Sequence, residues 1–250
     1  MAMLAASVTV DLRSFTRDMT AIERRQMPYA LMLALNETAK SGRLAVQKEM
    51  EKVFDRPTPY AKRGVVFDRA TRQKMQAAVV VTGDRTKGAL PATAFLGPQI
   101  EGGIRRHKAF EQQLIQRGHM QRREVAVPAQ RTKLDRYGNM TQGFLNQVMA
   151  DLLIDYRGAG ATRVRTDASL KRNSKYKNAR FFVPKRGGHL FPGVYQRHPG
   201  THDIFPVILF VTAKPYRIRL RLKDVVERHV SATFEENFAL AFQRAVATAR

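Results

Sequence analysis

Two long amphipathic patterns, one near each end of the 250-residue chain, constrain its fold more than any other feature. In the first, from Pro28 to about Phe54, apolar residues recur close to every 3.6 positions. In the second, Asp224 and Glu227 have the spacing of a capping box, and a regular apolar stripe follows. The stripes consist of Leu31, Leu35, Ala39, Val46, Met50 and Val53 in the first pattern, and of Val226, Val230, Phe234, Phe238, Phe242 and Ala245 in the second. We therefore predict two long helices that each pack along one face.

Shorter segments between these patterns predict both strands and helices. Apolar runs and alternations of strand length occur at residues 7–12, 75–83, 92–100, 124–128, 179–184, 203–213 and 216–222. Helical patterns occur at residues 14–25, 68–74, 104–117 and 143–156. The mixture predicts an α+β fold in which a small mixed or antiparallel sheet packs against the long N-terminal and C-terminal amphipathic helices.

Residues 157–179 differ in kind from the segments on either side. They contain glycines and many bases but few large apolar groups, which is typical of a loop or arm. We therefore predict N-terminal helices, strands and middle helices in residues 1–156, a basic loop or arm in 157–179, and C-terminal strands with the final helix in 180–250. The first and last of these segments are expected to form a single compact domain.

The charge of the chain is far from balanced. It has 44 Lys and Arg against 21 Asp and Glu, a formal net charge of +23 at pH 7. Such a chain attracts polyanions, and nucleic acid, anionic lipid and an acidic protein surface all qualify. Between Arg157 and Lys223 the excess is densest, with sixteen Lys and Arg against Asp167 and Asp203.

The composition also excludes several classes of protein. The chain has no cysteine, which excludes disulfides, thiolate nucleophiles and Cys-ligated metal sites. The longest apolar runs, such as residues 206–213, are far shorter than the ~20 residues of a membrane-spanning helix. The first twelve residues lack the basic start and the longer apolar core of a signal peptide, so we expect a protein made in the cytoplasm with no membrane partner.

A double glycine, Gly102 and Gly103, opens the basic stretch GGIRRHK. A phosphate cradle of the Walker type needs Lys and Ser or Thr at fixed offsets after its glycines, whereas Ile104 and Arg105 follow here. We therefore interpret the stretch as a turn that leads into a helix.

The histidines and carboxylates give little sign of catalysis. His198 and His202 have a spacing found in metal sites, and Asp203 is a conceivable third ligand. However, Pro199 and Gly200 between them prevent the helical geometry that would place both imidazoles on one face. The sequence also lacks HExxH and GxSxG motifs. We predict neither an enzyme nor a cofactor.

The strongest physical signal is the alternation in YRIRLRL, residues 216–222. Like charges at Arg217, Arg219 and Arg221, continued by Lys223, repel one another on one strand face unless an anion or an acidic partner neutralises them. We predict that this face binds a polyanion or an acidic protein surface without base specificity, because no helix-turn-helix, zinc finger or aromatic RNP pattern occurs. Further bases lie in the predicted arm, which we expect to order on binding: Arg163, Arg165, Lys171, Arg172, Lys175 and Lys177.

Six longer strings occur in a characteristic order and spacing. They are PYALMLALNETAKSGRLAVQKEM, VFDRPTPYAKRGVVFDRATRQKMQAAVVV, AFLGPQIEGGIRRHKAFEQQL, KLDRYGNMTQGFLNQVMADL, RFFVPKRGGHLFPGVYQRH and PVILFVTAKPYRIRLRL. Together they cover most of the chain, and in this order the chain resembles the minor tail protein Z family of tailed bacteriophages and prophages. The predicted arm carries no motif of this family.

The resemblance implies a structural protein of the virion. Such a protein completes the tail and joins head to tail at the neck or upper tail, as a cyclic homo-oligomeric ring around the DNA channel. Its implied partners are its own copies, the portal, adaptor, tail terminator or other tail proteins, and the DNA backbone in the channel. The resemblance also implies that GGIRRHK belongs to a shared structural module, with Arg105, Arg106 and Lys108 facing a neighbour or DNA. It transfers no catalytic residue.

Two alternatives remain open from the residues alone. One is a sequence-nonspecific DNA-binding protein that acts outside the particle. The other is a metal-dependent nuclease that uses His198, His202 and Asp203. Steep salt dependence of duplex binding by a monomer or dimer indicates the first, and cleavage that is lost on chelation indicates the second.

Overall fold

The computed structural model describes residues 5–7, 21–83, 90–152, 180–199 and 201–248. Their contacts group them into two compact units. Unit 1 comprises the described residues of 1–103 and 216–250, and unit 2 those of 104–215. The predicted α+β class, with long helices near both ends and small antiparallel sheets, is confirmed. The predicted boundaries at 156 and 179 stay predictions, and the arm itself lies outside the described residues.

Unit 1 begins with a short strand and one long helix. The strand β1 spans Ala5–Ser7 and the helix α1 spans Ala21–Val53. The predicted break into helices 14–25 and 28–54 is wrong, because Pro28 lies inside α1. A proline near a helix start removes a single donor, and the buried residues Met27 and Ala30 on either side hold this turn against the unit.

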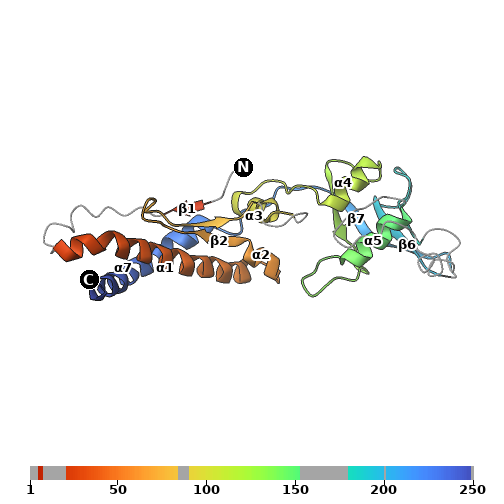
Figure 1. Ribbon diagram of the computed structural model, residues 1–250. Helices are drawn as coiled ribbons and strands as arrows, with labels where there is room; N and C mark the ends of the chain where they lie inside the picture. Colours follow the sequence, from red (N-terminus) through yellow and green to blue (C-terminus); the bar gives the residue numbers. More distant parts are fainter. Residues whose placement is uncertain (1–4, 8–20, 84–89, 153–179, 200, 249–250) are drawn as a thin grey trace. The chain divides into compact units, whose positions relative to one another are not determined.

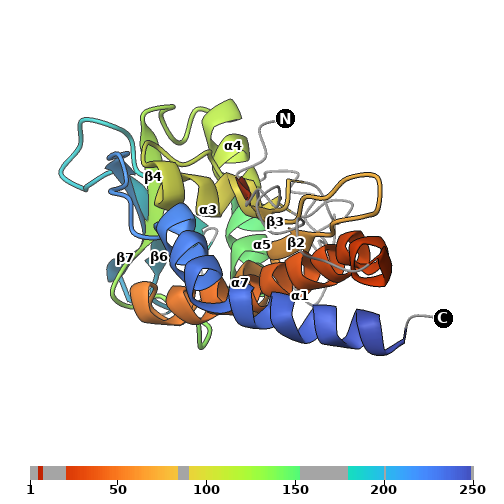
Figure 2. The ribbon, with the colours of Figure 1, turned by 90° about the vertical axis from the view of Figure 1, so that its left-hand side faces the viewer.

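The apolar stripe of α1 is buried as predicted from Leu31 to Met50, whereas Val53 at its end is only partly buried. The last helix, α7, spans Leu222–Ala247 and runs alongside α1 (Figures 1 and 2). The predicted capping box at Asp224 is wrong, because α7 begins at Leu222 after Arg221. Leu222 is buried in the core of unit 1, and this burial stabilises a helix that begins two residues before the predicted cap.

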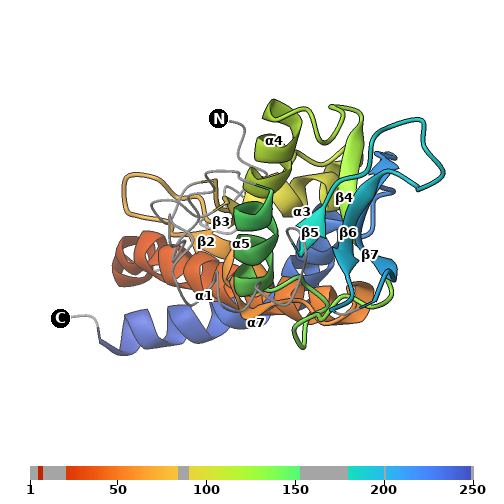
Figure 3. The same ribbon diagram turned by 90° about the vertical axis from the view of Figure 1, so that its right-hand side faces the viewer.

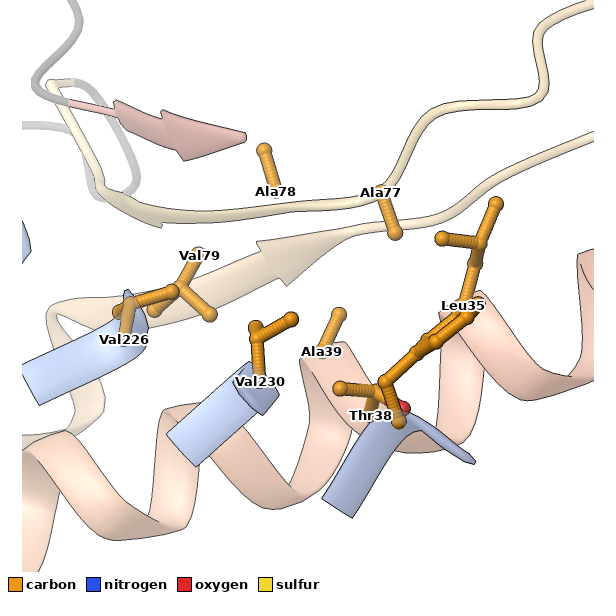
Figure 4. Close-up of a pocket in the computed structure, with 9 residues that line it drawn as sticks. Leu35, Thr38, Ala39, Ala77, Ala78, Val79, Val226 and Val230 are labelled. Carbon is orange, nitrogen blue, oxygen red and sulfur yellow. The ribbon is translucent and has the colours of Figure 1, made fainter. Parts of the chain in front are cut away.

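The small sheet of unit 1 packs on these two helices. Its antiparallel strands follow the order β1-β3-β2, with β2 at Val65–Asp68 and β3 at Ala78–Val81. Val79 and Val81 of β3 join the stripes of α1 and α7 in one core cluster. An apolar cavity of about 20 Å³ remains between β3 and the two helices (Figure 4). Its small volume and apolar lining identify a packing defect and not a ligand site.

Two elements of unit 1 differ from their predictions. The predicted helix at 68–74 is wrong: Asp68 ends β2, and Thr71 N–H donates to Lys74 O in a turn. The predicted strand at 92–100 is also wrong, because Ala92–Glu101 forms the helix α3. Ala92 and Leu96 are buried at a spacing of four, and the extended Pro91 precedes the first turn. A short helix, α2 at Pro59–Arg63, begins after Thr58, which accepts from Ala61 N–H.

Unit 2 is built on a four-stranded antiparallel sheet in the order β4-β7-β6-β5 (Figure 3). The strands span Glu124–Pro128, Phe181–Phe182, Gly193–Arg197 and Ile204–Thr212 for β4 to β7. The segments 124–128, 179–184 and 203–213 are confirmed as strand regions, but β6 was not predicted and separates β5 from β7. Pro206 in β7 cannot donate to the ladder, and a register shift lies opposite it in β6.

Two helices cover the sheet of unit 2. The helix α4 spans Ala109–Gln116 and α5 spans Gln142–Asp151. Both faces of β7 are buried, since Val207 and Ile208 point to opposite faces and are 2% and 0% exposed. The prediction of a helix from 104 is wrong in its start, because residues 104–108 are not helical.

The glycine at the start of β6 yields a sharp prediction. A Cβ at Gly193 would overlap the carbonyl oxygen of Ile208 on the neighbouring strand. Gly193→Ala should therefore separate the two central strands and lower the free energy of unfolding of unit 2 by about 1–3 kcal/mol. Native-state hydrogen exchange of β7 peptides measures this change.

The matched control is Gly143→Ala in α5, where a new Cβ would meet no atom within 4 Å. Alanine is the better helix former, so this variant should stabilise unit 2 by about 0.5–1 kcal/mol. Equal protection of β7 in the two variants would contradict the strand-separation argument.

Candidate polyanion interface

Residues 216–221 belong to no strand of either sheet, and Leu222 is already the first residue of α7. Tyr216 N–H donates to Gly103 O (2.8 Å), which forms an isolated bridge. The N–H groups of Arg219 and Leu220 both donate to the carbonyl of Gln99 near the end of α3 (2.8 and 3.0 Å). The prediction of a strand is therefore wrong, although the segment is held along α3 by its backbone.

The predicted alternation of this segment is correct only in part. Leu220 and Leu222 are buried in the core of unit 1, and the basic residues are exposed. Ile218, which the alternation placed inward, is 53% exposed, and Tyr216 is exposed too. The surface here consequently combines bases with apolar groups.

Arg219 has a structural role. Its guanidinium donates through Nη2 to the carbonyl oxygen of Val53, the last residue of α1, and lies 5.7 Å from the centre of the Phe54 ring. The last carbonyls of a helix have no partner within the helix, and an arginine at this position satisfies one of them. Arg219 thus ties the segment to α1.

The other three bases are available to a partner, and we call Arg217, Arg221 and Lys223 the basic segment. All three are exposed. Arg221 lies 3.7 Å from Asp224 and Lys223 lies 3.6 Å from Glu227, and such exposed pairs contribute little. Arg217 makes no ion pair with the described residues. These cations can therefore exchange their present neighbours for an external anion at small cost.

The double glycine is a backbone feature. Gly102 and Gly103 have φ values of +81° and +92°, a region that favours glycine. A Cβ at Gly102 would lie 3.3 Å from the carbonyl oxygen of Tyr216. The turn interpretation is therefore correct, but α4 begins only at Ala109.

Arg105 is bound within unit 2 by a buried carboxylate. Its Nη1 and Nη2 donate to Oε2 and Oε1 of Glu111 at 2.7 and 2.6 Å, and the Arg105 side chain is only 15% exposed. The Glu111 oxygens also accept from the N–H groups of Lys108 and Ala126. Burial opposes ionisation of Glu111, but these four donors outweigh it and hold its pKa below the ordinary value. We therefore leave Arg105 out of the candidate interface.

Arg106 and Lys108 remain exposed on unit 2 and stay candidates for contact with a partner. The six bases predicted in the arm, from Arg163 to Lys177, lie outside the described residues.

A second carboxylate–guanidinium pair joins β4 to the β5–β6 loop. Arg186 donates to both oxygens of Glu124, at 3.0 and 2.6 Å, and Gln121 N–H donates to the same carboxylate at 2.8 Å. Burial opposes the charge of Glu124, yet Arg186 and Gln121 lower its pKa overall. The same pairing raises the pKa of Arg186.

Acid should weaken unit 2 through these two glutamates. Their pKa values in the folded state are lowered, so the unfolded chain takes up protons first as the pH falls. The stabilisation is complete above the unfolded value of about 4.3 and is lost as the pH falls through the lower folded values. Protection of β7 amides should thus decrease below about pH 5, and less so in Glu124→Gln. A decrease of the same size in Glu124→Gln would exclude that carboxylate as a source.

The histidine pair does not form a metal site in the parts of the chain that the structure describes. His198 Nδ1 lies 3.0 Å from the carbonyl oxygen of Pro199, and Thr201 donates to the Asp203 carboxylate. No group of three His, Asp or Glu side chains with metal-binding geometry occurs among the described residues.

Three bases of unit 2 that were not predicted as site residues line one concavity, Arg131, Lys133 and Arg180. They are far apart in the sequence and belong to no periodic pattern, so only the fold brings them together.

Comparisons of the chain with protein families, with curated proteins and with solved structures found no match. Of the helices in the described ranges, none has the length and hydropathy needed to cross a membrane. The basic segment presents exposed guanidinium and ammonium groups, which are donors suited to phosphates and carboxylates.

Proposed function

We propose that this chain is a structural protein of a tailed-bacteriophage virion. It forms a ring at the neck or upper tail, completes the tail, and joins head to tail around the DNA channel. The proposal combines the resemblance of the six sequence strings to the minor tail protein Z family with the chemistry of the basic segment.

The observation that carries the proposal is the exposure of Arg217, Arg221 and Lys223 on a segment held by backbone hydrogen bonds. Exposed cations on such a segment suit contacts with phosphates, which position a protein on DNA without reading its sequence. A ring around DNA needs this kind of contact, because the DNA passes through it in every register.

Exposed apolar groups supply the second requirement, which is contact between proteins. Ile218 and Tyr216 adjoin the basic segment, and Leu44 of α1 and Leu240 of α7 are exposed on the helix pair. Apolar side chains of this size favour burial against neighbouring subunits.

A cryo-electron microscopy reconstruction of the intact particle tests the proposal. We expect a closed ring of this chain at the neck or upper tail, with the basic segment beside DNA or an acidic neighbour. If mass spectrometry of purified particles finds none of this chain, the protein is not a virion component. Duplex binding by the free protein would then favour the alternative of a DNA-binding protein outside the particle.

A further inference from the structure

Unit 2 contains a concavity of about 630 Å³, which we call the unit-2 groove. Phe205 and Val207 of β7 and Gln196 of β6 contribute to one wall, and Phe144 at the start of α5 contributes to another. A volume of this order is typical of sites for small molecules or short peptide segments.

The described lining of the groove is basic. Three of the described lining residues are cations, Arg131, Lys133 and Arg180, and none of the described ones is Asp or Glu. These cations raise the local potential inside a concave surface that focuses it. An anionic ligand is therefore the chemistry that the groove fits.

The protein holds two of these cations in place. The Arg131 guanidinium lies 5.3 Å from the centre of the Phe205 ring, and that of Arg180 lies 5.1 Å from the Phe181 ring. With its amide oxygen turned toward Arg180, Gln196 accepts from Nη2 and Nε at 3.0 and 3.1 Å. Guanidinium groups positioned in advance lose less freedom when they bind a carboxylate or a phosphate.

Nucleic acid fits the groove poorly. A duplex carries its phosphates on a convex surface, which cannot enter a concavity of this size. A single strand would need open aromatic faces for its bases. Phe205 packs against the core and is covered by Arg131, while Phe144 packs against the core and meets Phe181 edge-on at 5.7 Å between ring centres. Neither ring offers a free platform for stacking.

We propose that the unit-2 groove binds an acidic segment of a partner protein, with carboxylates on Arg131, Lys133 and Arg180. The segment comes from another protein, because the only adjacent acidic residues in this sequence are Glu235 and Glu236. This inference concerns unit 2 alone and does not depend on the basic segment or on assembly into a ring.

The test measures binding of a fluorescein-labelled deca-glutamate peptide to the full-length protein by anisotropy, at about 0.15 M salt, where exposed charges are largely screened. The groove variant is Arg131→Gln with Lys133→Gln, two exposed residues whose replacement leaves the core intact. The control is Arg122→Gln with Lys185→Gln, which removes two exposed charges of the same unit outside the groove. Far-ultraviolet circular dichroism checks that both variants are folded.

We expect the groove variant to raise the Kd of the peptide at least about tenfold and the control to raise it less than about twofold, since cations that line one concavity act on the bound carboxylates together, whereas isolated surface charges contribute little. Equal losses in the two variants would show general attraction to a basic protein and overturn the proposal. So would the absence of peptide binding to the unmodified protein. A ten-nucleotide oligo-dT that binds more tightly than the peptide, and loses affinity only in the groove variant, would assign the groove to single-stranded nucleic acid instead.

Discussion

Replacing Glu111 by alanine should lower the free energy of unfolding of unit 2 by about 3–5 kcal/mol. The carboxylate is 0% exposed and accepts from Arg105 twice and from the N–H groups of Lys108 and Ala126. Removing it leaves a guanidinium that is 15% exposed and two backbone donors without their acceptor. Hydrogen exchange of α4 and β4 peptides should show the loss, because Glu111 joins these two elements.

Glu101→Ala serves as the control, since Glu101 is an exposed residue at the end of α3 in unit 1. Exposed substitutions of this kind usually change stability by less than about 0.5 kcal/mol. If Glu111→Ala were no more destabilising than this control, the carboxylate would not be the link between α4 and β4.

Removing the basic segment should weaken binding to duplex DNA strongly. In the triple variant Arg217→Gln, Arg221→Gln and Lys223→Gln, three phosphate contacts are lost. Each contact accounts for about 0.9 in the slope of log K against log salt, so the slope should become shallower by about 2.7. At about 0.15 M salt this corresponds to a loss on the order of 100-fold in affinity. A salt titration of fluorescent duplex DNA with the full-length protein measures both quantities.

A second triple variant removes the same charge from the same unit. Lys40, Lys48 and Lys52 are exposed on α1, and their replacement by Gln leaves the basic segment intact. We expect its slope of log K against log salt to stay within about one unit of that of the unmodified protein, because these three lysines are not expected to contact phosphates. Equal changes in the two variants would mean that DNA responds to the net charge and not to the basic segment.

The elements that the sequence predicts best are those with a long and regular apolar period. The stripe of α1 repeats over about six turns, so Val46 and Met50 could be assigned to the core from spacing alone. The short run at 92–100 has no such length, and the same apolar residues fit a strand or a helix. Its helical form depends on burial of Ala92 and Leu96 against other parts of unit 1.

The candidate site was predicted in position but not in detail. Exposure of Arg217, Arg221 and Lys223 follows from their charge, whereas the role of Arg219 depends on the Val53 carbonyl, 166 residues earlier in the chain. The pairing of Arg105 with Glu111 could not be predicted either. A basic run before a helix has the same sequence pattern whether its side chains are exposed to solvent or paired with a buried carboxylate. Contacts formed only in the fold determine the roles of Arg105 and Arg219, and the spacing of residues within one segment does not predict such contacts.

The hydrogen bond between Tyr216 N–H and Gly103 O has a consequence for how this protein can change over time. The chain leaves unit 1 after Gly103 and returns to it at Tyr216, and the bridge pairs these two residues. Residues 104–215 are therefore an insertion between two adjacent points of unit 1. The core clusters agree, since among the described residues those of unit 1 contain none of 104–215. A chain with a short Gly-Ser linker in place of 104–215 should keep unit 1 folded, as insertions at adjacent ends generally permit. Unit 2, with its own core and groove, is then a module that can be exchanged for another without rebuilding unit 1, which carries the basic segment.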